Sequence, residues 1–309
     1  MTEENITYRV IPPCSAEQDN LLPLLARCFP NHWGKRPPGS PFPYAGTSFV
    51  AEAAGKFIGH AAIMHMKSEV AGQVLDVGGL ASVGVDPDWR GRGIAEKLCR
   101  MAEAYFGERN YAMLALYTAL YRVYEKSGWR RYDNAEKPWT LAGNVSGAKL
   151  IPGVAGGELD ETARALVLAA NAAGAKFPGK TVRYEGPKVR HSWKNLFGRA
   201  NLRFYIAPNG YAITCHGILE ELFAPESERK TLLASALAEN AGEVTVAVPP
   251  ECLSRDAAAK YGFAVSGEAK QDPMAGESPM IYTYADGRFP ELARAIAEKR
   301  LFFPAIDKF

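Results

Sequence analysis

The stretch from Val83 to Leu98 constrains the fold of this chain more than any other, because it changes from a strand pattern to a helix pattern across a glycine-rich turn. It reads V-G-V-D-P-D-W-R-G-R-G-I-A-E-K-L, and the valines at its start alternate as strand residues do. From Ile94 onwards, apolar residues recur every three or four positions, which is the core-facing stripe of a helix. The turn is expected at Gly91 and Gly93, since glycine adopts backbone conformations that expose N–H groups.

A helix that starts at such a turn is suited to bind an anion, because its first N–H groups are free and its dipole is positive there. Arg90 and Arg92 add positive charge, so a phosphate or pyrophosphate group is the expected ligand. Two nucleotide-binding patterns do not fit. There is no G-x-G-x-x-G with an acidic residue about twenty positions later, and the G-K-[ST] end of a phosphate-binding loop is missing. An ordinary strand-to-helix turn with surface arginines is the alternative.

Arg90, Gly93 and Ala95 fit a known pattern, since they resemble the R-x-x-G-x-[GA] signature of the GCN5-related N-acetyltransferases (GNAT). In that family the turn holds the pyrophosphate of acetyl-CoA, and the preceding strand hydrogen-bonds the pantetheine arm. The resemblance implies acetyl-CoA as co-substrate, without a metal, and Val85 as a backbone donor to the acetyl carbonyl oxygen. It implies cofactor contacts at Val83, Gly84, Val85, Arg90, Gly91, Arg92, Gly93, Ile94, Ala95 and Glu96.

The elements expected before the turn have the order of the GNAT fold. Strands are predicted at Phe49–Glu52, Lys56–Met66 and Val74–Val85. Gly78 and Gly79 interrupt the third of these strands, and a glycine within a strand often marks a bulge. By the resemblance, we expect a bulge here that splays two strands and admits the thioester.

A second motif follows, because the short helix expected at Leu120–Ser127 leads into Gly128-Trp129. It resembles the family's Y-x-x-x-G-[FYW] turn, whose tyrosine corresponds to Tyr124. In the family this tyrosine commonly protonates the departing CoA thiolate, so Tyr124 is the predicted catalytic acid. A buried tyrosine that only packs its ring is the alternative, and Tyr121, one turn away, is the competing candidate.

The second half of the chain, after about residue 150, repeats the order of elements in the first half. Strand-like runs at Leu202–Pro208 and Tyr211–Gly217 meet at Asn209-Gly210, which is a strong hairpin signal. There follow a helix near Glu228–Ala241, a strand at Val244–Val248, a short helix at Cys252–Tyr261, the pair Gly262-Phe263 and a last strand at Met280–Tyr284. We therefore expect an α/β (α+β) chain of two tandem GNAT-like folds, each with a mixed, mainly antiparallel sheet flanked by helices. The predicted parts are a catalytic domain (1–147), a degenerate GNAT-like domain (148–287) and a C-terminal helix with a docking tail (288–309).

The second fold is not expected to bind CoA, because the glycines of the turn are absent from it. Glu226 and Glu228 lie where a pyrophosphate would bind, and like charges disfavour that contact. A role in shaping the acceptor pocket is favoured, since clefts between domains are common ligand sites. A purely structural role, such as dimerisation, is the alternative, so association with a second copy stays open.

Two tandem folds of which only one binds the cofactor, as expected for this chain, resemble the enhanced intracellular survival type of aminoglycoside acetyltransferases. The 309 residues leave no room for the third, sterol-carrier-like domain of that group, which weakens any transfer of substrate. In the group, the terminal carboxylate of a final phenylalanine acts as general base, which implies the same role for Phe309. Hydrophobic anchoring of the apolar tail is the simpler alternative. Asp76 and Glu69 are further candidates for the base.

The acceptor is expected to be an amine of a small molecule, with a protein lysine or N-terminus as the alternative. The proline-rich, aromatic segment Phe29–Gly46 corresponds to a region that lines the acceptor site in this fold, so Trp33 and Tyr44 are predicted substrate contacts. A rigid surface loop would explain the segment equally well. A CoA-binding regulatory protein without turnover is the non-enzyme alternative.

Composition limits the partners. Lys+Arg 36 against Asp+Glu 34 leaves a net charge of +2, so no global field directs the chain to nucleic acid or membrane. No apolar run approaches the eighteen or so residues of a membrane span, and the acidic, polar N-terminus is unlike a secretory leader. Five scattered cysteines without a C-x-x-C pair favour the reducing cytoplasm. The five histidines lack metal-ligand spacing, so no metal is predicted.

Overall fold

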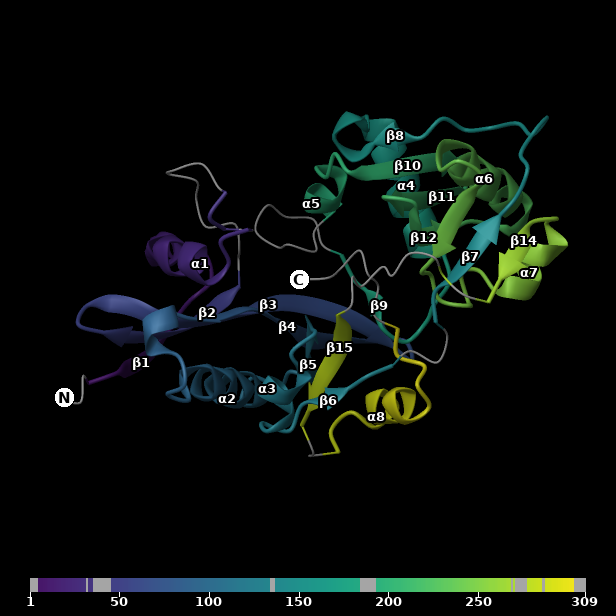
Figure 1. Cartoon of the computed structure of the whole chain (residues 1–309). Coiled ribbons are helices and arrows are strands. Elements are labelled where there is room, and N and C mark those ends of the chain that lie inside the picture. Colours follow the sequence, from purple (N-terminus) through teal and green to yellow (C-terminus); the bar gives the residue numbers. More distant parts are fainter. Residues whose placement is uncertain are drawn as a thin grey trace.

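The computed structural model describes residues 5–31, 33–35, 46–133, 137–183, 193–267, 269, 277–284 and 287–302. These residues form two sheets with helices packed against both (Figure 1). The first sheet contains β1 (Thr7–Ile11), β2 (Thr47–Ala53), β3 (Lys56–Val70), β4 (Gln73–Val85), β5 (Met113–Thr118), β6 (Arg130–Arg131), β9 (Lys180–Thr181) and β15 (Ser278–Thr283). The second contains β7 (Trp139–Ala142), β8 (Val154–Ala155), β10 (Leu202–Ala207), β11 (Gly210–Cys215), β12 (Ile218–Phe223), β13 (Glu243–Val246) and β14 (Ala264–Ser266).

The helices are α1 (Leu22–Cys28), α2 (Ile94–Gly107), α3 (Tyr121–Glu125), α4 (Glu161–Ala173), α5 (Trp193–Phe197), α6 (Glu226–Glu239), α7 (Arg255–Lys260) and α8 (Pro290–Ala297). Short 3-10 turns lie at η1 (Ala16–Leu21), η2 (Pro87–Trp89) and η3 (Gly156–Glu158). In both sheets most neighbouring strands are antiparallel; the exceptions are the parallel pairs β4–β5 and β12–β13. The predicted fold class, two mainly antiparallel sheets flanked by helices, is confirmed.

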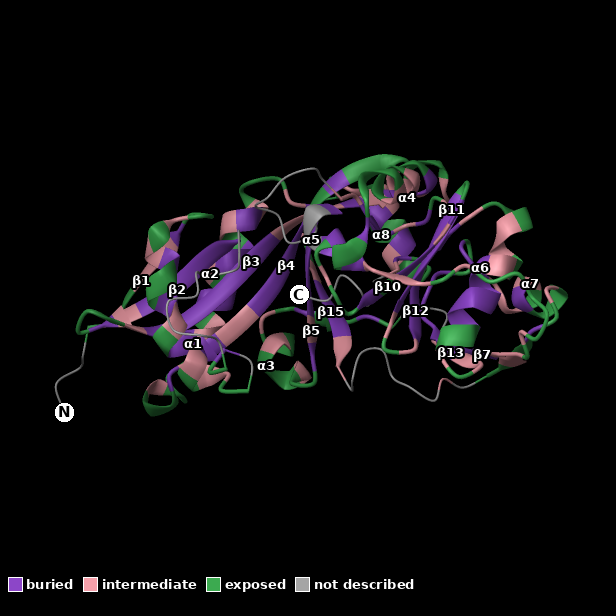
Figure 2. Cartoon of the chain, turned by 90° about the horizontal axis from the view of Figure 1, so that it is seen from above, coloured by how far each residue is buried: buried purple, intermediate pink, exposed green. Residues whose placement is uncertain are grey.

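Two glycines bring the helices of the first half close to its sheet, one on each face (Figure 1). A Cβ on Gly59 of β3 would lie 2.6 Å from a methyl carbon of Ile94, so only glycine lets the first turn of α2 approach so closely. A Cβ on Gly84 of β4 would lie 3.0 Å from Cys28 at the end of α1. The start of α2 and the end of α1 are therefore both fixed against the carboxyl end of β4. The strands between them are largely buried (Figure 2).

The two sheets exchange one strand each. β15, from the end of the chain, lies between β5 and β6 of the first sheet and pairs with both in antiparallel register. β7, from the first half, lies between β13 and β14 of the second sheet, again antiparallel to both. Sheet membership therefore does not change at a single point along the chain near residue 147.

The hairpin predicted at Asn209-Gly210 is present, with Ala207 of β10 paired to Gly210 of β11. The last predicted strand, Met280–Tyr284, is also present, but it belongs to the first sheet rather than to the second fold. Its side chains Met280 and Ile281 are buried there.

Candidate active site

A gap between β4 and β5 opens beside the start of α2. The two parallel strands pair only from Val77 to Gly79 on β4 and from Met113 to Ala115 on β5. Beyond Gly79, β4 continues for six residues to Val85 without a strand on its β5 side among the described residues. The backbone groups of β4 that point toward this edge therefore have no strand partner there among the described residues, and they can bind a ligand that lies between the strands.

The bulge expected near Gly78 and Gly79 lies instead at Ser82, which corrects the sequence interpretation. His60 of β3 pairs with Gly84 and Ala62 pairs with Ala81, so Ser82 and the residue after it oppose one residue of β3. Ser82 has a φ of 51°, in the left-handed region that few non-glycine residues adopt. Close packing accounts for the glycine at position 78, because a Cβ there would lie only 2.6 Å from a methyl carbon of Leu114.

A buried hydrogen-bond chain holds the Ser82 bulge. His60 Nδ1 donates to the carbonyl oxygen of Ser82 at 3.0 Å, which leaves Nε2 to accept from the hydroxyl of Ser48 at 3.1 Å. The amide of Gln18 then donates to the same hydroxyl at 3.1 Å. All three side chains, Gln18, Ser48 and His60, are buried. The sequence interpretation considered His60 only as a metal ligand and missed this role; its one signal was a histidine within an apolar strand.

The turn after β4 is fixed by Asp86, a second residue that the sequence interpretation missed. Asp86 donates its backbone N–H to the carbonyl of Ile58 at 2.9 Å, and its carboxylate accepts the N–H of Asp88 at 3.0 Å. Arg27 of α1 reaches the same carboxylate at 2.7 Å and that of Asp88 at 3.0 Å. The turn is thus tied to both β3 and α1.

The first turn of α2 has the free N–H groups that an anion site needs. Gly93 precedes the helix with a φ of 73°, and no side chain caps the helix start. Gly91 has a φ of 77°, and a Cβ at either glycine would meet no atom within 4 Å. Both glycines are therefore required by backbone conformation rather than by crowding.

Two exposed arginines flank this helix start. Arg90 donates from Nε to the carbonyl oxygen of Val85 at 3.1 Å, which fixes its stem against the end of β4. The guanidinium of Arg92 lies 4.5 Å from the ring centroid of Trp89. The structure thus brings together the predicted cofactor residues from Val83 to Glu96 around one turn and one helix start. Glu96 is the one acidic residue among these predicted cofactor residues, and its carboxylate forms an ion pair with Arg100 at 3.0 Å.

Tyr124 lies on α3, which follows the carboxyl end of β5 after two residues. Its ring packs against the core that contains α2 and contacts Trp129 edge-to-face, with ring centroids 6.1 Å apart. Burial, followed by the nearby Cys99 and Glu277, raises the pKa of Tyr124 well above its ordinary value. The phenol therefore stays protonated at neutral pH, which is the form that can donate a proton.

Trp129 fixes the position of Tyr124 and is itself held from two sides. Its indole N–H donates to the buried carboxylate of Glu103 on α2 at 2.7 Å. Tyr282 of the exchanged strand β15 lies on the indole, with ring centroids 5.8 Å apart. Tyr121, the competing tyrosine, instead donates to the hydroxyl of Ser278 on β15 at 3.2 Å.

Comparison with known proteins finds a family resemblance in the first part of the chain. Residues 12–132 match the family model described as acetyltransferase (GNAT) domain. These residues are therefore similar to GNAT acetyltransferase domains, and the match covers less than half of the chain. The match includes the β4 edge, the turn at Gly91 and Gly93, and Tyr124. No functionally curated protein matches the chain in sequence.

Solved structures resemble the whole chain in fold. A GCN5-related N-acetyltransferase from Kribbella flavida is 17% identical with a TM-score of 0.60, over 90% of this chain and 71% of that one. Eis1 from Mycobacterium abscessus is 15% identical with a TM-score of 0.60, over 95% and 76%. A GCN5-related N-acetyltransferase from Anabaena variabilis is 16% identical with a TM-score of 0.58, over 90% and 73%. At these identities the likeness shows the fold alone, and it extends beyond residues 12–132 into the second sheet.

Of the two predicted acceptor residues, the structure describes only Trp33. Trp33 is 5% exposed and packs in the core between α1, β1 and β2. Tyr44 and Phe309 lie outside the described residues. Among the other candidate bases, Asp76 pairs with Lys67 at 2.9 Å and Glu69 with Lys176 at 3.1 Å.

Those last two carboxylates lie away from the unpaired edge of β4. Glu69 is paired to Val74 and Lys67 to Asp76, near the turn between β3 and β4 and before the strands separate. Within the described ranges, no group of three or more His, Cys, Asp or Glu side chains could hold a metal ion. In the same ranges, no helix has the length and apolar content of a membrane span.

Proposed function

We propose that the chain is an acetyl-CoA-dependent N-acetyltransferase that moves an acetyl group to an amine of a small molecule. The observation that supports this most is the meeting of the unpaired β4 edge with an uncapped, glycine-opened helix start. Together they offer backbone hydrogen bonds to an extended arm and an anion site at one end of it. The family match of residues 12–132 supports the same class of reaction.

The residues around the turn fit acetyl-CoA. The open space at Gly91 and Gly93 lets a diphosphate approach the first N–H groups of α2. Arg90 and Arg92 are exposed beside them and add charge-assisted hydrogen bonds. The N–H groups of β4 that face the gap bind the pantetheine arm, and one of them, with Val85 the expected donor, polarises the acetyl carbonyl. Acetyl-CoA supplies an activated acetyl group as a thioester.

The proposed reaction needs two proton transfers, one to the departing sulfur and one from the acceptor amine. Tyr124 donates its phenolic proton to the departing sulfur, and its raised pKa keeps that proton available. The acceptor must lose a proton because an ammonium has no lone pair. By the resemblance to the enhanced intracellular survival type, the terminal carboxylate of Phe309 is the proposed base.

An acetyl-CoA turnover assay over aminoglycosides, polyamines and amino-acid-like amines tests the proposal. We expect turnover with at least one of them, and a kcat at least about 100-fold lower in Tyr124→Phe, the loss typical of a missing general acid. Tyr121→Phe is the matched control, since its hydroxyl is bound to Ser278; its kcat should stay within about threefold of the parent. Acetyl-CoA binding without turnover of any small amine would contradict the proposal, and turnover of peptide amines alone would indicate a protein acceptor.

A further inference from the structure

Ser82, the first of the two bulge residues in β4, has a strained backbone. Its φ of 51° lies in the left-handed region, and glycine normally takes this position in a bulge of this kind. Of the described non-glycine residues with a positive φ, Ser82 alone lies within a strand, and the others lie outside the strands and helices. Such strain persists only where the surrounding structure enforces it, and it is concentrated at functional sites.

The second sheet shows that a bulge in this fold does not require such strain. The register of β11 against β12 shifts between Ile213 and Thr214, which leaves Glu220 as the extra residue of a bulge. The backbone of Glu220 lies outside the left-handed region. Beyond Leu219, β12 separates from its parallel neighbour β13, as β4 separates from β5 beyond Gly79.

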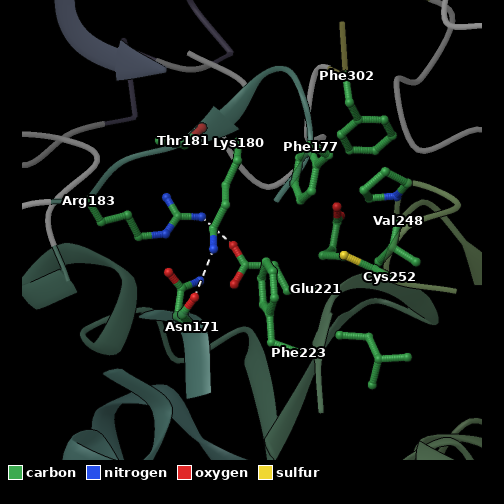
Figure 3. Close-up of a pocket in the computed structure, with 13 residues that line it drawn as sticks. Asn171, Phe177, Lys180, Thr181, Arg183, Glu221, Phe223, Val248, Cys252 and Phe302 are labelled. Carbon is green, nitrogen blue, oxygen red and sulfur yellow. Dashed lines mark hydrogen bonds and ion pairs between the residues drawn. The ribbon is translucent and has the colours of Figure 1, made fainter. Parts of the chain in front are cut away.

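Side chains of the chain itself meet across this second gap (Figure 3). The guanidinium of Arg183 pairs with the carboxylate of Glu221, and the Lys180 ammonium donates to the backbone carbonyl of Asn171 at 2.8 Å. In the first gap, the edge of β4 beyond Gly79 has no strand partner among the described residues. The strained bulge therefore belongs to the gap whose edge is unpaired.

The hydrogen bond from His60 to the Ser82 carbonyl fixes the direction of the next N–H group. A peptide unit is planar and trans, so its C=O and its N–H point in opposite directions. His60 lies on β3, and its Nδ1 donates to the Ser82 carbonyl at 3.0 Å, so the N–H of Val83 points away from β3. That is the side of the unpaired edge.

A second hydrogen bond gives the same direction. The Asp86 N–H donates to Ile58 of β3 at 2.9 Å, so the Val85 carbonyl in that peptide unit points to the unpaired edge. Backbone groups of a strand alternate with a period of two residues, so those of Val83 point to the same edge. The helix start at Ile94 follows Val85. An arm that extends from a diphosphate there along β4 therefore meets Val83 nearer to its acyl end.

We propose that His60 is a positioning residue for acetyl transfer, which holds the Ser82 carbonyl so that the Val83 N–H donates to the thioester carbonyl of acetyl-CoA. The Ser48 hydroxyl donates to Nε2 of His60, which keeps the ring in the tautomer that donates from Nδ1. A donor aimed at the carbonyl stabilises the negative charge that develops on its oxygen during attack. The Val85 N–H, the donor expected from the family resemblance, then binds the pantetheine arm instead. This role of His60 rests on the proposed function.

Carbon-13 NMR of acetyl-CoA labelled at its carbonyl carbon tests this role without an acceptor amine. A hydrogen bond to the carbonyl oxygen moves the signal downfield, so we expect acetyl-CoA bound to the full chain to resonate downfield of free acetyl-CoA. The amide of Asn takes the place of ring Nδ1 and that of Gln the place of Nε2, so His60→Asn keeps the Ser82 contact and His60→Gln loses it. The downfield shift should fall by about half or more in His60→Gln and stay close to that of the parent in His60→Asn.

Ser82→Gly distinguishes positioning by His60 from a role in core packing. Glycine adopts the left-handed conformation without strain, so Ser82→Gly combined with His60→Gln should regain most of the lost shift. A packing defect would not respond to this change. His65→Gln is the matched control, because both ring nitrogens of His65 are hydrogen-bonded on the same strand but away from the bulge. Its carbonyl shift should equal that of the parent.

Steady-state kinetics give a second measurement with any amine that the turnover assay identifies. In His60→Gln, kcat should fall at least about tenfold while the Kd of acetyl-CoA changes less than about threefold, since the donor acts mainly on the transition state. A loss of acetyl-CoA affinity as large as the loss of kcat would contradict a positioning role.

A carbonyl signal that is unshifted in the parent, or equally shifted in the parent and His60→Gln, would overturn the role of His60. The same holds for a loss of shift that Ser82→Gly leaves unrelieved. The measurement on the parent needs no variant, so an unshifted signal overturns the role even if a variant folds poorly. A shifted carbonyl together with no turnover of any small amine would count against the proposed function only.

Discussion

At the scale of single residues, His60 connects the N-terminal segment to the strand that the proposed site uses. Its ring is fully buried and donates to Ser82 at the bulge of β4 while it accepts from Ser48 of β2. Burial lowers the pKa of His60 to about 4, against 6.5 in the unfolded chain. The imidazole is therefore neutral in the folded protein over the pH range where the unfolded chain binds a proton.

This difference predicts a specific pH dependence of stability. Between pH 6.5 and 4 the unfolded state binds one more proton at this position, so stability falls as pH falls through that window. By linkage, His60 contributes a loss of about 3 kcal/mol over this range. Urea unfolding at several pH values should show a slope about one proton smaller in His60→Gln than in the parent. Equal slopes in the two proteins would contradict a neutral, buried His60.

At the scale of elements, the start of α2 depends on the left-handed conformation of Gly93. Gly93→Ala should destabilise the fold by about 1–2 kcal/mol, the cost of this conformation for an L-residue. It should also weaken acetyl-CoA binding at least about tenfold, since it displaces the first N–H groups of the helix. Gly72→Ala is the matched control: Gly72 has a φ of 79° and open space, but lies in the turn at the far end of β4. Calorimetry should show equal stability losses and unequal losses of affinity.

The elements that the sequence predicted best are those with a strong local signal. The turn at Gly91 and Gly93 and the start of α2 at Ile94 agree with the prediction, because glycine and helical periodicity act within a few residues. Strand β12 was missed because Glu220 and Glu221 do not resemble a buried strand. Burial of Glu221 depends on Arg183, 38 residues away, and no local pattern reports such a pairing.

At the scale of the whole molecule, the exchange of β7 and β15 could not be predicted from the sequence. Each strand has the length and pattern of a last strand in its own half, and strand patterns do not specify the partner sheet. The consequence for the proposed site is direct. Tyr282 of β15 lies on Trp129, which contacts Tyr124, so the second half of the chain helps to position the predicted acid. The exchange joins the two sheets into one structural unit.

Because each sheet contains a strand from the other half of the chain, we predict that neither half folds alone. Residues 1–147 without β15 would leave a gap between β5 and β6 and would carry the apolar side chains of Trp139 and Leu141 without their sheet. Residues 148–309 would lack β7 between β13 and β14. Each fragment expressed alone should lack cooperative unfolding in circular dichroism, because buried apolar surface is exposed in both. Co-expressed, the fragments should purify together at one to one and regain a single transition, since each supplies the strand that the other sheet needs. A fragment 1–147 that is monomeric and unfolds cooperatively by itself would show that the exchanged strands are dispensable for the first fold.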